Sequence, residues 1–331
     1  MMALTLKPMR VKDLAAKVVK GDRSAVAKAI TLVENGGADS ALLLRTIGPK
    51  LGRAFVLGVT GPPGTGKSSV IDRLAEHYRK KGLKVGIIAI DPTSPLTGGA
   101  LLGDRVRMVD LTMDEGVYIR SMASRGWAGG LSAAVSDVIQ ILDASGTDLV
   151  IVETVGTGQS DTDIIRVAHA VAVVLMPGMG DDIQASKAGL MEIGDLYLVN
   201  KADLPGADDT VVDLLAMVKD QRGRNPAVLK ASATSGEGIE AVAAGIEKTR
   251  SRFLSPSPSD EGKEIRLRSI RGMITERARK KALGEMEDKD TEIGRLALSV
   301  LARKITIDDA ADSILRGRRA SRGSGRAGSR N

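Results

Sequence analysis

The stretch that most constrains the fold of this 331-residue chain is GVTGPPGTGKSSVIDRLAEH, residues 58–77. An apolar run passes into a turn rich in glycine and proline, and Lys67 and Ser68 then open a helical pattern. Glycine lets backbone N–H groups approach a ligand without Cβ clashes, and a helix N-terminus carries a partial positive charge. The pattern Gly61-x-x-x-x-Gly66-Lys67-Ser68 is therefore typical of a loop that cradles a nucleotide polyphosphate.

The side chains of this pattern have expected tasks in binding a triphosphate. Lys67 would reach the outer phosphate oxygens, and the Ser68 hydroxyl would bind Mg²⁺. The strand-like run before the motif and the amphipathic helical pattern after it supply the context that the motif needs. The expected phosphate-binding residues are Gly61, Pro62, Pro63, Gly64, Thr65, Gly66, Lys67, Ser68 and Ser69.

Seven apolar runs alternate with helical stretches between residues 54 and 233, which indicates an α/β domain. The runs are AFVLGVT, KVGIIAI, GVYIRSM, DLVIVET, AVAVVLMP, DLYLVNK and AVLKASA. Continuous apolar strands separated by helices predict a mostly parallel sheet with helices on both faces. Hydrophobic residues make up 43% of the chain and aromatic residues only 2%, so aliphatic side chains must fill most of the core.

The sequence on either side of this domain predicts further helices, a linker and a tail. Apolar residues at three- and four-residue spacing predict helices over residues 10–47, with breaks at Gly21 and Gly36. The expected parts are an N-terminal helical segment 1–50, the nucleotide-binding domain 51–254, a linker 255–264 (SPSPSDEGKE), a C-terminal helical arm 265–316 and a basic disordered tail 317–331.

Charge and composition exclude several classes of function. The net charge is +7, but six arginines and no acids lie between Arg316 and the end, so the rest of the chain is near neutral. A Gly/Ser/Arg tail is typical of a solvated segment, and an anion- or nucleic-acid-binding tail is the weaker alternative. With no Cys and two His, disulfides and Cys/His metal clusters are not expected. We find no signal peptide or membrane-spanning run, which favours the cytoplasm.

The order Asn200-Lys201-Ala202-Asp203 at the end of an apolar run predicts recognition of guanine. The Asp203 carboxylate can accept hydrogen bonds from N1–H and the exocyclic amine of guanine, whereas adenine offers no such donor pair. Lys201 would lie along the base and ribose. Ser232, Ala233 and Thr234 follow another run, where their backbone N–H groups could meet the guanine oxygen.

Acidic residues at the ends of other apolar runs are candidate ligands of Mg²⁺. Ligands gather at the carboxyl edge of a parallel sheet, and Mg²⁺ takes oxygen ligands, so Asp91, Glu153 and Asp104 would join Ser68 at the metal. Each acid could instead cap a helix or stabilise a turn. Lys67 would stabilise charge on the transferred phosphoryl group, and the residue that orients the attacking water is left open among Asp91, Glu153 and Gln159.

Six stretches between residues 10 and 205 together resemble one family, the MeaB/ArgK-type GTPases associated with adenosylcobalamin-dependent methylmalonyl-CoA mutase. They are GDRSAVAKAITLVEN, GVTGPPGTGKSS, AIDPTSPLTGGALLGDRVRM, ETVGTGQSD, PGMGDDIQASKAG and VNKAD. The common GTPase switch pattern is Asp-x-x-Gly, whereas Glu153 begins the pattern here, as is typical of this family.

The resemblance implies a P-loop NTPase G domain of the SIMIBI class that uses GTP and GDP with Mg²⁺. It also implies a homodimer, formed through the C-terminal arm, that acts as a GTP-driven chaperone. Such a protein gates adenosylcobalamin loading and protects or reactivates the mutase, or a related cobalamin-dependent acyl-CoA mutase. Residues 178–189 would form a loop that signals to the mutase, with Asp181, Gln184 and Lys187 at the matching positions.

Two other functions remain as alternatives from the sequence. A P-loop kinase for a small molecule or protein, linked to amino-acid transport, would need an acceptor pocket and a lid, and no insertion suggests one. A metallochaperone GTPase would need Cys/His clusters, and the two histidines are isolated in the sequence. We therefore expect a GTP hydrolase with slow intrinsic turnover that its partner raises.

Overall fold

The computed structural model describes residues 8–91, 109–123, 133–156, 160–179, 189–219, 226–255, 259–286, 292–310 and 313. Its chain divides into two compact units, Met1–Met273 and Ile274–Asn331, and each is described by itself. Within the described residues, no helix is both long and apolar enough to pass through a bilayer. The predicted tail, residues 317–331, lies outside the described residues.

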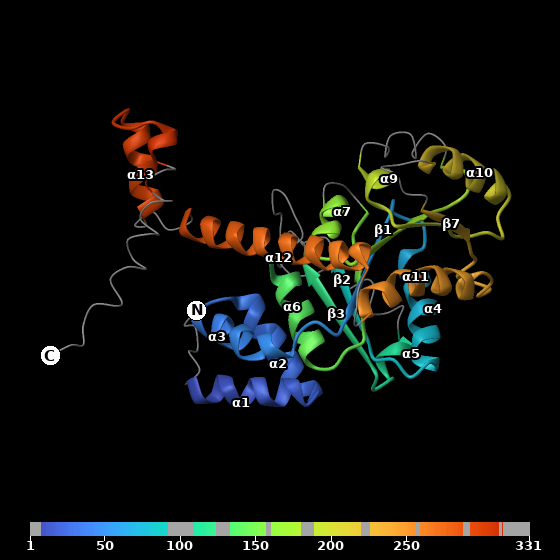
Figure 1. Ribbon diagram of the computed structural model, residues 1–331, viewed down its shortest axis with the longest axis horizontal. Helices are drawn as coiled ribbons and strands as arrows, with labels where there is room; N and C mark the ends of the chain where they lie inside the picture. The colour runs from blue at the N-terminus through green and yellow to red at the C-terminus, as the bar shows by residue number, and fades with distance from the viewer. Residues whose placement is uncertain are drawn as a thin grey trace. The chain divides into compact units, whose positions relative to one another are not determined.

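A seven-stranded sheet forms the centre of the first unit (Figure 1). Its order is β3-β2-β4-β1-β5-β6-β7, and every neighbouring pair is parallel. The predicted α/β fold is thus confirmed, with each of the seven apolar runs forming a strand. The strands are β1 Phe55–Thr60, β2 Val85–Asp91, β3 Val117–Ala123, β4 Leu149–Glu153, β5 Ala170–Leu175, β6 Leu196–Val199 and β7 Ala227–Lys230.

Helices connect the strands and cover the sheet. Because parallel strands need crossover connections, each strand is followed by a helical segment before the next begins. The N-terminal helices are α1 Pro8–Val19, α2 Arg23–Asn35 and α3 Ala38–Ile47, followed by the short η1 Gly48–Lys50. The other helices of the first unit are α4 Lys67–Lys80, α5 Val109–Thr112, α6 Ala133–Ala144, α7 Ser160–Asp163, η2 Ile164–Arg166, α9 Leu190–Ile193, α10 Ala207–Val218 and α11 Ile239–Leu254.

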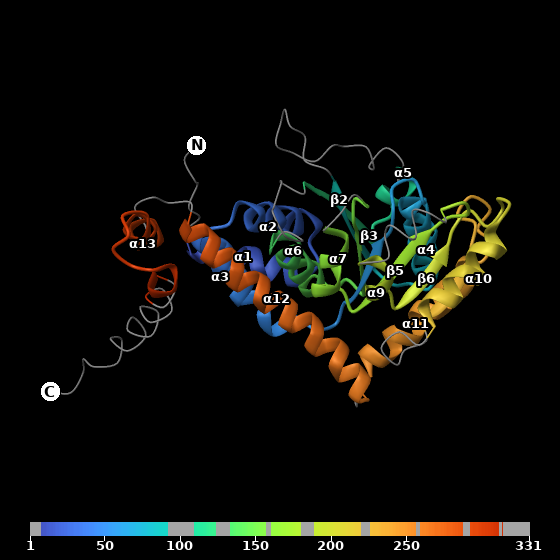
Figure 2. The same cartoon turned by 90° about the horizontal axis from the view of Figure 1, so that it is seen from above.

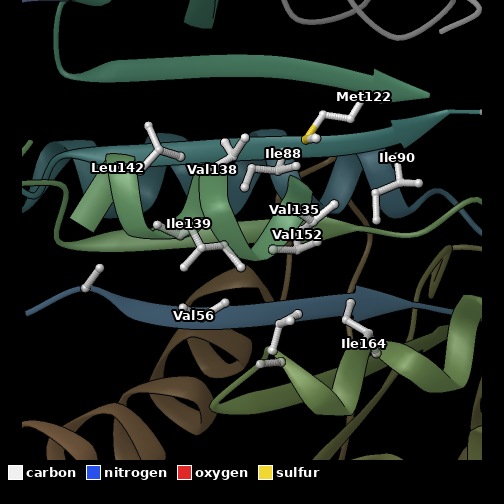
Figure 3. Packing of buried hydrophobic residues seen from close by; sticks show 14 of the residues in the cluster. Val56, Ile88, Ile90, Met122, Val135, Val138, Ile139, Leu142, Val152 and Ile164 are labelled. Carbon is white, nitrogen blue, oxygen red and sulfur yellow. The ribbon is translucent and has the colours of Figure 1, made fainter. Parts of the chain in front are cut away.

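The two faces of the sheet carry two separate cores. On one face, alternate strand residues such as Val56, Ile88 and Val152 pack with side chains of α6, as Figure 3 shows. That core continues into the buried faces of α1, α2 and α3. On the opposite face, Phe55 and Leu57 pack with residues of α4 and α11, and Figures 1 and 2 show these two helices across the sheet from α6. Successive β1 residues therefore serve opposite cores, as the two-residue period of a strand requires.

The linker prediction is wrong for residues 260–264, because α12 Asp260–Met286 begins there. Ser259 caps this helix: its hydroxyl accepts from the Gly262 N–H at 3.3 Å, and its carbonyl accepts from the Lys263 N–H at 3.0 Å. Polar composition indicated a linker, but a serine followed by two acids is also a helix start. The division between units falls within α12, and the second unit contains α13 Glu292–Leu301.

Candidate nucleotide-binding site

The phosphate loop leaves β1 at Thr60 and enters α4 at Lys67, at the carboxyl edge of the sheet. Gly61 has φ 141°, and a Cβ there would lie 2.0 Å from the backbone oxygen of Val174. Gly66 has φ 86°, and a Cβ there would lie 2.4 Å from the Asn200 side-chain amide. Both positions therefore require glycine for space as well as for backbone conformation.

Lys67 folds back over the loop that precedes it. Its Nζ donates to the carbonyl oxygens of Gly61 and Pro62 at 2.9 and 3.1 Å, and the side chain is buried. The Thr65 hydroxyl donates to the same Pro62 oxygen at 2.9 Å. These bonds hold the loop compact, with a cation at the helix N-terminus where a phosphate anion is favoured.

Ser68 and Glu153 meet at the same edge, at the ends of neighbouring elements. The Ser68 hydroxyl donates to Glu153 Oε1 at 2.7 Å. Glu153 ends β4 and lies in register with Val59 of β1 and Ala89 of β2. Asp91, which ends β2, is buried like Glu153. Three of the four expected Mg²⁺ ligands thus lie on α4 and on the ends of the paired strands β2 and β4.

This donor set fits Mg²⁺ bound together with a nucleotide. No group of three or more His, Cys, Asp or Glu side chains suited to a metal occurs among the described residues. Mg²⁺ in nucleotide sites needs only one or two protein oxygens besides phosphate oxygens and water. A hydroxyl and a carboxylate already within 2.7 Å meet that need. Asp104 lies outside the described residues, so its part stays a prediction.

The segment after Glu153 comes very close to the phosphate loop. Gly156 has φ 86°, and a Cβ there would lie 2.4 Å from the Gly61 oxygen and 2.7 Å from Lys67 Nζ. The Gly156 N–H donates to Asp161 at 3.0 Å, and the Thr154 hydroxyl donates to that of Thr60 at 2.9 Å. The Glu153-Thr154-Val155-Gly156 pattern is therefore held against the loop and its lysine.

On the opposite side of the phosphate loop, Asn200 joins two segments that are far apart in the sequence. Its Nδ2 donates to the Thr65 oxygen at 2.8 Å, and its Oδ1 accepts from the Ala233 N–H at 3.1 Å. This buried side chain ties the phosphate loop to residues 232–234, and the expectation that Asn200 also reads guanine stays a prediction. The short Asn-Lys-x-Asp pattern predicts that Asn200 is a site residue, but it does not predict these two hydrogen bonds.

Lys201, Asp203 and Ser232 lie on the same side of the site as Asn200. Lys201 adopts a left-handed φ of 58°, and its Nζ donates to the sulfur of Met176 at 3.3 Å. The Asp203 side chain is exposed. A hydrogen bond from Ser232 is the main cause that holds the pKa of Asp203 below its usual value, so this carboxylate stays ionised as an acceptor.

One residue of this region was missed by the sequence reasoning. Arg73, on α4, donates from Nε to the Ala233 oxygen at 2.8 Å and from Nη2 to the Thr234 oxygen at 3.2 Å. A side chain on the polar face of a helix, bonded to backbone 160 residues away, leaves no local sequence signal.

Two other groups of expected residues lie outside the described residues. Gln159, a candidate for orienting water, is one of them. Asp181, Gln184 and Lys187, of the segment 178–189, are the others. The choice among Asp91, Glu153 and Gln159 therefore stays open.

Comparisons with known proteins agree with this geometry. The family model described as methylmalonyl-CoA mutase-associated GTPase MeaB matches residues 26–287. A Pyrococcus horikoshii protein described as a GTPase is 44% identical over 92% of this chain and 97% of its own. GTPase ArgK of Escherichia coli is 44% identical over 56% of this chain and 57% of its own.

A solved structure described as LAO/AO transport system kinase superposes with a TM-score of 0.68 at 25% identity. It covers 95% of this chain and 99% of its own. The G-domain fold implied by the resemblance is thereby confirmed. With a family model that matches most of its length and a relative that is 44% identical over 92% of it, the chain belongs to the family of methylmalonyl-CoA mutase-associated GTPases, MeaB.

Proposed function

We propose that this protein is a GTP-driven switch that binds GTP and GDP with Mg²⁺ and assists a cobalamin-dependent mutase. Residues 61–69 would bind the phosphates. Ser68, Glu153 and Asp91 would hold Mg²⁺, which would neutralise charge on the phosphates when bound. Lys201 would lie along the base and Asp203 would accept hydrogen bonds from guanine.

The observation that supports this most directly is the double hydrogen bond of Asn200. It joins Thr65 of the phosphate loop to Ala233, in the middle of the loop Ser232–Thr234 that is expected to meet guanine. A ligand with a phosphate end and a base end would therefore contact two segments that are already linked. This link supports the proposal of a nucleotide bound across the two segments.

Catalysis in this proposal rests on charge stabilisation and positioning. The Lys67 ammonium and the loop N–H groups would stabilise charge that develops on the transferred phosphoryl group. Glu153 accepts from Ser68 and so holds the hydroxyl in place at the start of α4. The buried Asp91 is at the next strand end, where it could orient water or a metal-bound water.

The partner follows from the family rather than from the site. The family is described as mutase-associated, and we propose adenosylcobalamin-dependent methylmalonyl-CoA mutase or a related mutase as the partner. In the same proposal, a homodimer gates cofactor loading and reactivates the mutase. Intrinsic hydrolysis would be slow, and the mutase would raise it.

The test is GTP turnover by the purified protein with and without purified mutase, together with a pull-down of partners by protein loaded with GDP or with a GTP analogue. We expect slow phosphate release that the mutase accelerates, and nucleotide-dependent capture of the mutase. Rapid turnover that does not respond to mutase would contradict the chaperone proposal.

The kinase reading is the second candidate because the similar solved structure is described as a transport system kinase. Incubation with γ-labelled GTP separates the two functions. A hydrolase releases inorganic phosphate, whereas a kinase transfers the label to a protein or small molecule. A metallochaperone is disfavoured because the chain has no Cys and two His.

A further inference from the structure

Arg73 links the helix that begins at the phosphate loop to the loop Ser232–Thr234. Lys67 and Ser68 open α4, and Arg73 lies on the same helix. Its guanidinium donates to two successive carbonyl oxygens, of Ala233 at 2.8 Å and of Thr234 at 3.2 Å. Its remaining nitrogen, Nη1, pairs with Glu76 at 3.3 Å.

These bonds fix the orientation of two peptide planes in the loop. The carbonyl of Ala233 shares its rigid peptide plane with the N–H of Thr234, so a bond to one sets the direction of the other. The Ala233 N–H itself is already donated to Asn200 at 3.1 Å. Within the described part of the chain, the Thr234 N–H makes no hydrogen bond, which leaves it available to a ligand.

The loop is thus clamped from two sides by different means. Asn200 holds the N–H side of Ala233 from the buried interior, and Arg73 holds its carbonyl side from the half-exposed surface. Ser232, at the start of the loop, also bonds Asp203, the expected reader of guanine. A planar guanidinium can span two carbonyls with fixed geometry, whereas a lysine ammonium acts as a single point.

We propose that Arg73 is a positioning residue for recognition of the guanine oxygen O6, and that it couples the base-binding loop to the phosphate-binding helix. This inference rests on the proposed guanine-nucleotide function. By holding the plane of the Ala233 carbonyl, Arg73 directs the Thr234 N–H toward the base. An adenine amino group at the same position cannot accept this bond, so Arg73 also contributes to the choice of guanine over adenine.

The test measures binding of GDP, IDP and ADP to the full chain by titration calorimetry. IDP keeps the oxygen O6 but lacks the exocyclic amine that Asp203 would bind, and ADP lacks the oxygen. Arg73→Ala should weaken the binding of GDP and the binding of IDP equally, by about tenfold, which is the effect expected for one well-placed hydrogen bond. ADP, which depends on the phosphate loop, should change less than twofold.

Two further variants, Arg73→Lys and Glu76→Gln, are measured in the same way. The lysine variant should recover only part of the GDP affinity, because it can meet one carbonyl at a time. Glu76→Gln removes the neighbouring ion pair but leaves both carbonyl bonds, so its affinities should match the wild type. Thermal unfolding is followed in parallel, and Arg73→Lys keeps the test valid if the alanine variant does not fold.

Several results would overturn the inference. Unchanged GDP affinity in Arg73→Ala would exclude a role for Arg73 in binding. An equal loss of affinity for GDP, IDP and ADP would show that Arg73 acts on phosphate binding and not on the base. If wild-type protein binds GDP and ADP equally well, the guanine proposal itself fails, and this outcome is read from the wild type alone.

Discussion

Gly156 shows how a single residue can control the phosphate site. A Cβ at this position would meet both the Gly61 oxygen and the Lys67 ammonium, at 2.4 and 2.7 Å. Backbone atoms cannot yield as a flexible side chain can. The position therefore demands glycine for its closeness to the loop, beyond the conformational demand of its φ of 86°.

We predict that Gly156→Ala lowers GTP turnover by at least about tenfold, because the added methyl group displaces Lys67 from the phosphate site. Single-turnover hydrolysis and GDP titration measure the effect. Gly146→Ala is the matched control: Gly146 also has φ 86°, but nothing lies within 4 Å of a Cβ there. Equal effects of the two substitutions on turnover would show that backbone strain, and not the contact with the loop, is responsible.

His169 is a second residue whose surroundings decide its behaviour. Its Nδ1 accepts from the Val56 N–H at 2.9 Å, and its ring stacks on Phe253 with a centroid distance of 4.0 Å. Burial lowers the pKa of His169 to about 3, with the charges of Arg268 and Arg266 adding to the effect. The imidazole is thus a neutral group of the core.

This depressed pKa predicts a loss of stability in acid. Above pH about 6.5, His169 is neutral in both states. As the pH falls toward 3, the unfolded chain binds a proton that the folded chain does not, so stability falls by up to about 1.4 kcal/mol per pH unit. His169→Asn keeps an acceptor for Val56 but cannot titrate. Urea unfolding from pH 8 to 4 should give a shallower decline for this variant, and parallel curves would refute the argument.

At the scale of elements, the site residues lie at the carboxyl edge of the sheet, and the N-terminal helices are attached at the opposite edge. Asp143, near the end of α6, accepts hydrogen bonds from the N–H groups of Gly52, Arg53 and Ala54 at 2.6, 3.0 and 2.9 Å. One buried carboxylate thereby fixes the segment that enters β1. The strand that bears the phosphate loop is held at its start by this contact.

We predict that Asp143→Asn destabilises the protein by about 2 kcal/mol, because an amide cannot accept all three bonds and brings an N–H group toward another donor. Urea unfolding at pH 7 measures the change. Asp148→Asn, which removes the charge from a carboxylate that accepts one bond from the backbone N–H of Lys84 at 2.8 Å, should cost less than about 1 kcal/mol. The affinity for GDP should be unchanged in both variants, since neither residue is near the phosphate loop. A large loss of GDP affinity in Asp143→Asn would contradict the view that Asp143 acts on stability alone.

Elements were predicted well because their signals are local. The apolar runs of β1 to β7 and the glycines at residues 61 and 66 are continuous in the sequence, and the structure has them as strands and as the loop. Contacts between distant segments leave no such pattern. Arg73 with Ala233, Asp143 with Ala54, and Asn200 with both Thr65 and Ala233 arise only when the sheet brings its edges together.

At the scale of the whole molecule, α12 carries apolar side chains that the described chain does not cover. Leu267, Ile270 and Ile274 are 43%, 47% and 63% exposed, and their spacing of three and four residues places them on one stripe of the helix. An exposed apolar stripe of this kind is typical of a surface that pairs with another. It lies within the arm 265–316 that we propose for dimerisation.

The proposed homodimer predicts a specific difference between two exposed apolar positions. Ile270→Asp places a charge in the stripe and should convert the dimer to monomer, because an unpaired carboxylate in an apolar interface opposes association by several kcal/mol. Val212→Asp is the matched control on α10, since Val212 is 64% exposed and lies outside the arm.

Light scattering after size-exclusion chromatography gives the mass of each species at tens of micromolar protein. A monomeric wild type would refute the proposed homodimer, and a dimer that tolerates Ile270→Asp but not Val212→Asp would place the interface away from α12. Because the site residues of β1, α4 and β6 are all contributed by one chain, the monomeric variant should still bind GDP with the wild-type affinity.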